Sequence, residues 1–515
     1  MKRFTEEEIL KIIGEPNGAD KLVNMNADPD DLFEKAVSLF EKSGLASALI
    51  VRLLNKKQYL IKLSEDGDFL SAVSRNLTGE NAKLRRNSAR LAGALKRGSF
   101  VPELISALEN ETQRFVRPSF ILALGSIGGE EAKAYLANYK VAPPADETEE
   151  KHFREETEAL KTALRSFAPK EEHAFTGFTE PYAVELRAPD LLTQQLREEL
   201  SELGFEPYDD RHDSIKVKTA DYPALFGARC FIEALFPVGT ADCVPSAVAK
   251  KAAPFMYKLM RSSHSGNPPF RFRVELKAEI RDPERRQTLV REIADMCESD
   301  GLVNAPSDYE AELRIEGNEK GVRLFVKLYT VKDTRFSYRR ESIPASINPA
   351  VAASVLRFAQ EHFKVGARVI DPCCGSGTML IERAMLSPCQ SLTGVDIAHR
   401  AIDAARTNTS LAGVNAKYIV NDILRFECHR PYDELIANLP FGNRVGTHSS
   451  CEKLYRGLIE KLPELLKKGG VAVLYTMEFT LLKKIIKENP RVTLIKQQRT
   501  EAGGLTPMIF IVEVN

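Results

Sequence analysis

The stretch ARVIDPCCGSGTMLIERA, from Ala367 to Ala384, decides the fold of the C-terminal third of the chain. Its first five residues form an apolar run that predicts a buried strand, and the glycine-rich turn after them opens a helix. Gly375 and Gly377 would let the backbone approach a ligand closely, where any side chain would clash. The dinucleotide fingerprint needs a third small residue, and Leu380 stands in that place, so the turn favours a nucleoside without a pyrophosphate.

Strands and helices alternate on both sides of this turn. Besides Ala367 to Asp371, the expected strands are Ser391 to Asp396, Ala416 to Asn421, Asp433 to Asn438, Val471 to Thr476, RVTLIKQQ from Arg491 and PMIFIVEV from Pro507. A short helix from Asn348 to Gln360 precedes them. This alternation predicts a doubly wound, mostly parallel sheet, in which ligands bind at the carboxyl ends of the strands.

Acidic residues follow two further strands of this predicted sheet. Asp396 ends the second strand, where a carboxylate can accept from both hydroxyls of a ribose. Asp422 follows the third strand, where it could accept from the exocyclic amine of an adenine. Each Asp alone is equally well explained as a helix cap or turn residue. Together with the glycine turn they mark three successive strand ends, and this combination predicts a nucleoside site.

The fourth strand ends in Asn438-Leu439-Pro440-Phe441-Gly442. The side-chain oxygen of Asn438 and the carbonyl of Leu439 are two acceptors able to hold an NH₂ group, and Phe441 offers a ring on which a base can stack. Such a grip suits methyl transfer to an exocyclic amine, because it aligns the nitrogen lone pair for in-line displacement. The structural alternative is a Pro-Phe-Gly turn, which the nearby glycine loop makes the less favoured interpretation.

Two of these motifs resemble one enzyme family. Asp371 to Glu382 and Asn438 to Arg444 resemble the S-adenosylmethionine loop and the catalytic tetrapeptide of the amino-methylating RNA methyltransferases that carry an N-terminal THUMP domain. Tyr338 to Leu356 is similar to that family's linker, so the resemblance covers about Glu172 to Asn515, with a ferredoxin-like module plus THUMP before the linker. The family pattern usually has Pro where this chain has Leu439, whose backbone carbonyl can still act as the acceptor.

The resemblance implies a class I S-adenosylmethionine-dependent RNA (guanine-N2) methyltransferase and assigns residues to its site. The expected cofactor-binding residues are Asp371, Pro372, Cys373, Gly375, Gly377, Thr378, Asp396, Ile397, Asp422 and Ile423. Among them, Asp371 and the two glycines would hold the methionine part, Asp396 the ribose and Asp422 the adenine. The expected catalytic residues are Asn438, Leu439, Pro440 and Phe441.

The middle of the chain has an α+β pattern. From Pro181 to Val238 the expected order is strand, helix, strand, helix, with Tyr222 to Leu235 as the second helix. A strand at Arg271 to Ile280, a helix at Asp282 to Glu298, and the strands YEAELRIE from Tyr309 and GVRLFVKLYT from Gly321 follow.

The N-terminal region is helical and repetitive. The segment from Leu77 matches the segment from Leu108 at an offset of 31 residues, which also pairs Arg86 with Arg117, Leu91 with Leu122 and Ala92 with Ala123. This period resembles short HEAT-like repeats, whose helix pairs stack on one another. The expected domains are residues 1–141 for the helical repeats, 142–171 for a charged linker helix, 172–345 for the ferredoxin-like plus THUMP region and 346–515 for the Rossmann-like methyltransferase domain.

Two runs of basic residues are candidates for RNA contacts. The expected RNA-binding residues are Arg323, Lys327, Lys332, Arg335, Arg339, Arg340 and Arg444, the first six interleaved with Phe325, Tyr329, Phe336 and Tyr338. The alternation fits equally well a strand with buried aromatics and solvated cations. The second run, Lys83, Arg85, Arg86, Arg90, Lys96 and Arg97, has no acid between its ends and is interpreted as a solvated helix face.

Composition sets further limits. A chain of 515 residues is too long for one core, and Lys+Arg and Asp+Glu balance at 72 each, so a polyanion site must be a local patch. The eight cysteines form no CxxC pair, so we expect reduced thiols and no metal. No stretch is long and apolar enough for a membrane span, and the start of the chain has acidic residues where a signal peptide would have its apolar core. We therefore expect no membrane association and a cytoplasmic location.

The favoured function is tRNA guanine-N2 methylation, a step of tRNA processing, with S-adenosyl-L-methionine as cofactor and tRNA as partner. Methylation of guanine-N2 in rRNA or of adenine-N6 in nucleic acid stays open, because the tetrapeptide grips any exocyclic amine. A non-catalytic cofactor-binding RNA scaffold is the alternative from another class, and the intact Asn438 and Phe441 argue against it. The sequence indicates neither the modified position nor the oligomeric state.

Overall fold

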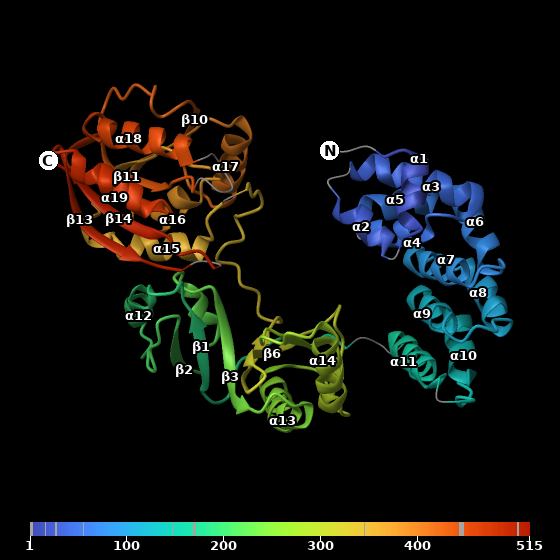
Figure 1. Ribbon diagram of the computed structural model, residues 1–515. Coiled ribbons are helices and arrows are strands. Elements are labelled where there is room, and N and C mark those ends of the chain that lie inside the picture. The colour runs from blue at the N-terminus through green and yellow to red at the C-terminus, as the bar shows by residue number, and fades with distance from the viewer. Residues whose placement is uncertain are drawn as a thin grey trace. The chain divides into compact units, whose positions relative to one another are not determined.

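The computed structural model describes residues 4–15, 17–25, 28–54, 56–146, 148–167, 171–344, 346–441, 448–501 and 504–515. The chain divides into two compact units, Met1–Lys170 and Glu171–Asn515. The first unit is helical and the second contains two seven-stranded sheets (Figure 1). The expected fold class is confirmed: helical repeats, a central α+β region and a C-terminal α/β region.

The helices of the first unit pack around one apolar core. They are α1 (Glu6–Ile13), α2 (Gly18–Asn24), α3 (Pro29–Ser43), α4 (Ser47–Leu53), α5 (Lys57–Glu65), α6 (Gly67–Leu77), α7 (Ala82–Leu95), α8 (Phe100–Glu109), α9 (Arg117–Ile127), α10 (Glu130–Asn138) and α11 (Glu150–Ser166). Helix α7 contacts α4 on one side and α9 on the other, and α9 contacts α11. These four helices therefore form one layer of the stack.

Close helix contacts recur along this layer. Gly93 of α7 lies against α9, where a Cβ would come within 2.9 Å of the Ala123 Cα, and Gly125 of α9 lies against α11, where a Cβ would come within 2.7 Å of the Ala163 Cα. The Ser126 hydroxyl donates to the Gly93 carbonyl at 2.9 Å. Small residues at these contacts let the helix backbones approach closely.

The repeat within these helices is 32 residues, not the expected 31. Gly93 and Gly125 occupy equivalent places, and five of the six buried residues of α7 recur as buried residues 32 positions later in α9. An offset of 31 would match the fully buried Leu91 with Leu122, which is 42% exposed. Arg85, rather than Arg86, therefore corresponds to Arg117.

The central sheet has the strand order β2-β1-β3-β7-β6-β4-β5. Its strands are β1 (Tyr182–Arg187), β2 (Ser214–Thr219), β3 (Glu233–Ala241), β4 (Phe270–Leu276), β5 (Leu302–Asn304), β6 (Ala311–Asn318) and β7 (Gly321–Leu328), and its helices are α12 (Thr193–Glu202), α13 (Pro245–Ser263) and α14 (Pro283–Cys297). Strand β4 is parallel to β5 and β6, and the other pairings are antiparallel. The three helices share one apolar core with the sheet.

The helix expected at Tyr222 to Leu235 is wrong. Only Pro223–Gly227 forms a short 3₁₀ helix, η1, and the chain is extended as β3 from Glu233 onward. Strand β3 lies between β1 and β7, and its buried residues Ala234, Leu235 and Phe236 pack in the middle of the sheet. Tertiary pairing thus overrides the local pattern. Helix α13, which contacts β3, is not among the expected elements.

The C-terminal sheet has the strand order β10-β9-β8-β11-β12-β14-β13. Its strands are β8 (Ala367–Asp371), β9 (Cys389–Asp396), β10 (Lys417–Val420), β11 (Tyr432–Asn438), β12 (Leu466–Thr476), β13 (Val492–Arg499) and β14 (Met508–Val514), and its helices are α15 (Pro349–Phe358), η2 (Gln360–His362), α16 (Thr378–Leu386), α17 (His399–Leu411), α18 (His448–Leu465) and α19 (Phe479–Glu488). The first five strands in this order are parallel, and β14 is antiparallel to both of its neighbours.

Helices cover this sheet on both faces, because α15, α16 and α17 belong to one apolar core while α18 and α19 belong to another. The chain runs outward from β8 through β9 to β10, and then in the other direction from β11 to β12. The direction of winding therefore reverses between β8 and β11, and in such sheets ligands bind at the carboxyl ends of the strands at this point.

Candidate active site

The glycine turn connects β8 to α16 at the point where the winding reverses. Gly375 and Gly377 have φ angles of +51° and +80°, in the left-handed region that glycine adopts without strain. A Cβ at Gly377 would lie 2.7 Å from the Tyr418 hydroxyl of β10, so packing within the domain requires this glycine. Among the described residues, a Cβ at Gly375 would meet only Ile343, at 3.5 Å. Gly375 is therefore the glycine that leaves room for a ligand.

The carboxylate of Asp396 holds this turn in place. One oxygen accepts the Gly375 N–H at 3.0 Å and the other accepts the Ala398 N–H at 2.9 Å. A carboxylate has about four lone-pair sites, so these two bonds leave acceptor capacity for ribose hydroxyls. The next residue, Ile397, is 73% exposed and gives the site an apolar surface.

Asp371 is a buried acid at the end of β8. It is 1% exposed and accepts the Cys373 N–H at 3.0 Å. Burial raises the pKa of its carboxyl to about 8, against the lowering effect of that hydrogen bond, and the nearby Asp396 raises it further. Among the described residues, no cation contributes to this pKa shift, so the carboxyl is suited to receive a positively charged ligand group.

The remaining expected cofactor residues are Pro372, Cys373, Thr378, Asp422 and Ile423. Pro372, Thr378 and Ile423 are buried, and burial raises the pKa of the half-buried Cys373 thiol well above its ordinary value. Asp422 lies two residues beyond Val420, which pairs with Asp396 across the sheet. One of its carboxylate oxygens accepts the Leu424 N–H at 2.9 Å, which is the turn role considered for it above, and the other lies 4.0 Å from Arg425.

The expected catalytic tetrapeptide begins at the end of the neighbouring strand β11. Asn438 is its last residue and pairs with Tyr475 of β12. The Leu439 side chain is 1% exposed and lies in the apolar core, while its N–H donates to the Tyr475 carbonyl at 2.9 Å. With the side chain buried, only the backbone of Leu439 is left to act in the site. Phe441 is half-buried, with its ring centroid 6.1 Å from that of Tyr475.

Two side chains of α18 hold the tetrapeptide in place through the Pro440 carbonyl. The Tyr455 hydroxyl of α18 lies 2.7 Å from the Pro440 carbonyl, to which it donates, and 2.6 Å from the Thr476 hydroxyl. The Cys451 thiol also donates to the Pro440 carbonyl, at 3.3 Å. Sequence reasoning missed Tyr455 and Cys451, because they lie beyond the motif in the chain and no local pattern identifies them.

A buried asparagine ties the linker before α15 to the glycine turn. Asn408 of α17 accepts the N–H groups of Arg340 and Glu341 at 3.1 and 3.0 Å. Its amide donates to the carbonyls of Glu341 and Ser376, at 2.8 and 3.0 Å. The hydroxyls of Ser346 and Ser376 lie 3.0 Å apart. Sequence reasoning did not single out Asn408 either.

Arg335 is a correction to the expected RNA contacts. Its side chain is 2% exposed and pairs with Asp333 at 2.6 Å. The same guanidinium donates to the carbonyls of Ala228 and Phe231, both at 3.0 Å. Arg335 thus fixes the segment just before the linker to the rest of the central region and presents no surface to a phosphate.

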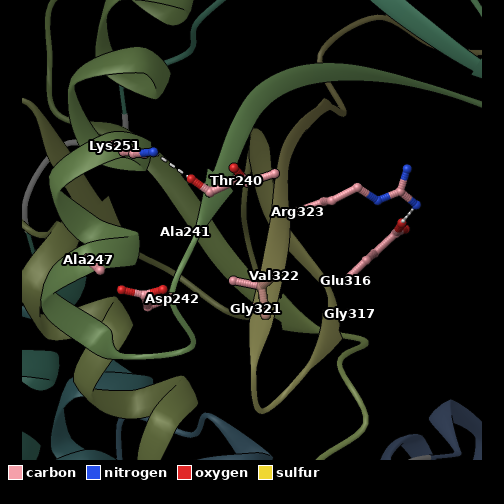
Figure 2. Close-up of a pocket in the computed structure, with 10 residues that line it drawn as sticks. All are labelled: Thr240, Ala241, Asp242, Ala247, Lys251, Glu316, Gly317, Gly321, Val322 and Arg323. Atoms are coloured by element: carbon pink, nitrogen blue, oxygen red, sulfur yellow. Dashed lines mark hydrogen bonds and ion pairs between the residues drawn. The ribbon is translucent and has the colours of Figure 1, made fainter.

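Arg323 and Lys327 lie on a polar face of the central sheet. Arg323 is 3.4 Å from Glu316, and Lys327 is 3.2 Å from Glu233. Figure 2 shows Arg323 beside a cavity of about 580 Å³ formed by β3, β6, β7 and α13, with its guanidinium turned toward Glu316. Both cations are thus already paired with carboxylates, which lowers the charge that they offer to a phosphate.

The remaining candidates differ in exposure. Lys332 and Arg340 are exposed, whereas Arg339 is half-buried and reaches the Ser346 carbonyl at 3.4 Å. Arg444 lies outside the described residues. Of the interleaved aromatics, Phe325 and Tyr338 are 2% and 4% exposed, so they are not available for stacking on bases.

All eight cysteines lie in the described part of the chain and are unpaired, so none of them forms a disulfide. Within the described ranges, no group of three or more His, Cys, Asp or Glu side chains is placed to hold a metal ion. No helix in that part of the chain is long and apolar enough to cross a membrane.

Comparisons with known proteins identify two regions of the chain. Residues 337–507 match the family model described as "RMKL-like, methyltransferase domain", and residues 70–150 match the model of HEAT repeats. The C-terminal region is therefore a methyltransferase domain, and the expectation of HEAT-like repeats is confirmed.

Curated relatives of modest identity carry related names. The chain is 24% identical over 306 residues to the tRNA (guanine(6)-N2)-methyltransferase of Thermus thermophilus, covering 58% of this chain and 86% of the relative. It is 27% identical over 137 residues to the U6 snRNA (guanine-N(2))-methyltransferase THUMPD2 of Bos taurus, covering 26% of each chain.

The fold is also similar to solved structures. TrmN from Thermus thermophilus matches with a TM-score of 0.51 at 21% identity, covering 65% of this chain and 99% of that one. This likeness supports the architecture of the C-terminal unit.

Proposed function

We propose that this chain is an S-adenosylmethionine-dependent RNA methyltransferase that methylates the N2 amine of a guanine in tRNA. The matched methyltransferase domain and the names of the relatives support the reaction class. The choice of tRNA rests on a relative of which the chain covers 86%, a tRNA guanine-N2 methyltransferase.

The residues at the strand ends fit S-adenosylmethionine. Gly375 leaves space that a Cβ would fill, and the buried Asp371 lacks a cationic partner among the described groups that shift its pKa. Asp371 would hold the ammonium group of the methionine part, and Asp396 the ribose hydroxyls. When bound, the cofactor supplies an electrophilic methyl group on its sulfonium.

The observation that carries the proposal is the position of Asn438 at the end of β11, next in the sheet to β8 and its glycine turn. The Asn438 side-chain oxygen and the Leu439 carbonyl would accept hydrogen bonds from the two N–H groups of a guanine amine, and Phe441 would stack on the base. These contacts would orient the nitrogen lone pair, and the amine would lose one proton to solvent once it is methylated. A guanine must leave its helical stack to reach this site, since an amine engaged in a duplex is not accessible there.

We assign RNA holding to the central region and the linker. This region resembles a ferredoxin-like module plus THUMP, and Lys332 and Arg340 are its exposed candidate cations. The buried contacts of Arg335 fix the segment just before the linker to the central region, and those of Asn408 attach the linker to the glycine turn. Through these contacts, RNA held by the central region would stand at a defined distance from the methyl-transfer site.

The test is nucleoside mass spectrometry of tRNA, rRNA and DNA after incubation with the protein and labelled cofactor. We expect N2-methylguanosine in tRNA, and Asn438→Ala should abolish it while cofactor and tRNA binding stay close to normal, because the lost contact acts at the reacting nitrogen. Asn415→Ala is the matched control. It replaces an exposed asparagine that precedes β10, at the edge of the sheet opposite to the carboxyl ends of the strands, and it should remain active. N6-methyladenosine, or N2-methylguanosine only in rRNA, would contradict the assignment.

A further inference from the structure

The exposed side of α7 in the helical-repeat unit carries a row of cations. Lys83, Arg86 and Arg90 are spaced by three and four residues, so they lie on one side of the helix over about 10 Å of its length. Lys83 and Arg90 are exposed and Arg86 is half-exposed. We call these three residues the α7 cation row.

The arginines of this row differ from other arginines of the same unit in their surroundings. Arg85, on the same helix, forms a two-pronged pair with Glu111 at 2.7 and 2.8 Å, and Arg114 pairs with Glu156 at 2.9 Å. Within the described residues, no carboxylate lies within 4.0 Å of Arg86 or Arg90. Other arginines of this unit are thus paired with carboxylates, whereas none of the described side chains provides a counter-charge for Arg86 or Arg90.

The row is also electrostatically unfavourable in the isolated protein. Arg90 as a whole is exposed, but the partial desolvation of its guanidinium, together with the neighbouring Arg86 and Arg52, holds the pKa of Arg90 below its ordinary value. Like charges four residues apart destabilise a helix, and cations near its N-terminus oppose the helix dipole. A bound polyanion would offset the repulsion between these cations and their unfavourable interaction with the helix dipole.

The repeat does not require cations at these places. With the 32-residue repeat, Arg86 corresponds to Pro118 and Arg90 to Leu122 of α9, whereas the buried positions of the two helices agree. Packing thus dictates the buried side of α7 but not the charges on its exposed side. A charge that the fold neither needs nor neutralises suggests a partner.

We propose that the α7 cation row is a second RNA-binding surface, on which Lys83, Arg86 and Arg90 contact successive phosphates of the RNA backbone. The inference rests on the proposed function for the identity of the polyanion. The chain has no net charge, so attraction to RNA must come from local patches of this kind. The sequence alone suggested that this run is only a solvated helix face. We instead infer that it contacts the RNA backbone, in a manner that does not depend on base sequence.

The experiment measures tRNA binding by the full-length protein as a function of salt, for the native protein and for Arg86→Ala/Arg90→Ala. Loss of two phosphate contacts should make the slope of log affinity against log salt shallower by about 1.5 to 2, so that the advantage of the native protein shrinks roughly ten-fold between about 50 and 200 mM salt. Arg86→Lys/Arg90→Lys keeps the charge and should restore most of the slope. Lys133→Ala/Lys151→Ala, which removes two exposed lysines from α10 and α11, is the charge-matched control and should leave the slope unchanged.

An unchanged slope in Arg86→Ala/Arg90→Ala, or an equal change in the control, overturns the proposal. Both arginines are at least partly exposed and repel each other, so thermal unfolding of the double variant should occur at the native temperature or above it, which excludes a folding defect. The proposed function is judged separately by methyl transfer at saturating tRNA. That activity should persist in the double variant, and its absence in the native protein would refute the enzyme assignment while the salt slopes still decide the cation row.

Discussion

Replacing Asp371 by Asn should stabilise the protein more and more as the pH rises. The Asp371 carboxyl is buried, and its pKa is raised from 3.8 to about 8. Above about pH 4 the unfolded chain releases this proton, whereas the folded protein retains it up to about pH 8. The folded state therefore binds more protons across this window, and the native protein loses stability as the pH rises through it.

The size of the effect follows from this pKa difference. Each pH unit between about 4 and 8 should remove about 1.4 kcal/mol of stability, for a total on the order of 6 kcal/mol. In Asp371→Asn the new amide has nearly the shape of the carboxyl and can still accept the Cys373 N–H, but it cannot ionise. The difference in unfolding free energy between Asp371→Asn and the native protein should thus be small near pH 4 and reach several kcal/mol near pH 8.

The assay is urea unfolding of both proteins at several pH values. The transition to be followed is that of the second unit, residues 171–515, which contains Asp371. Taking the difference between the two proteins cancels the other titrating groups. Asp403→Asn, on the exposed side of α17, is the matched control and should show no such trend. S-adenosylhomocysteine, whose ammonium favours an ionised Asp371, should bind more weakly to the variant. A stability difference that is constant with pH would refute the reasoning.

Three other substitutions test individual roles in the site and the linker. Asp396→Ala should weaken cofactor binding by about 2 kcal/mol in titration calorimetry, because it removes both the ribose contacts and the anchor of Gly375; unchanged affinity in a folded protein would contradict that role. Arg335→Ala should lower the unfolding free energy by about 2 kcal/mol in urea and leave the salt dependence of RNA binding unchanged, so a flattened salt slope would restore it as an RNA contact. Gly377→Ala should cost about 1 to 3 kcal/mol in thermal unfolding, because its φ is +80° and its Cβ would lie 2.7 Å from the Tyr418 hydroxyl; unaltered stability would show that the turn relaxes freely.

Much of the C-terminal domain was predictable because its signals are local. Buried parallel strands appear as short apolar runs, and all seven expected strands are present. A glycine turn after such a run needs no distant partner to be recognised. The expectation that Asp371, Asp396 and Asn438 lie together followed from one topological rule, that carboxyl ends of parallel strands share an edge.

The sequence-based predictions were wrong where residues distant in the chain determine the local structure. Tyr222 to Leu235 has an apolar pattern that fits a helix, yet the place between β1 and β7 makes its end a strand. Arg335 lies in a basic run that suggests solvent exposure, but its guanidinium is buried because it donates to the carbonyls of Ala228 and Phe231. The repeat register differed by one because sequence similarity did not reveal which residues of α9 are buried.

The sequence by itself determined the class of fold, the glycine turn and the chemical types at the strand ends, since each depends on a few consecutive residues. Only the tertiary structure decided that Gly375 rather than Gly377 leaves room for a ligand, and that Asn408 ties the linker to the turn. It also showed that, among the described residues, Arg86 and Arg90 lack the carboxylates that neutralise Arg85 and Arg114. Open space, hydrogen-bond partners and counter-charges are properties of neighbours in space, and these neighbours come from segments that the chain order keeps far apart.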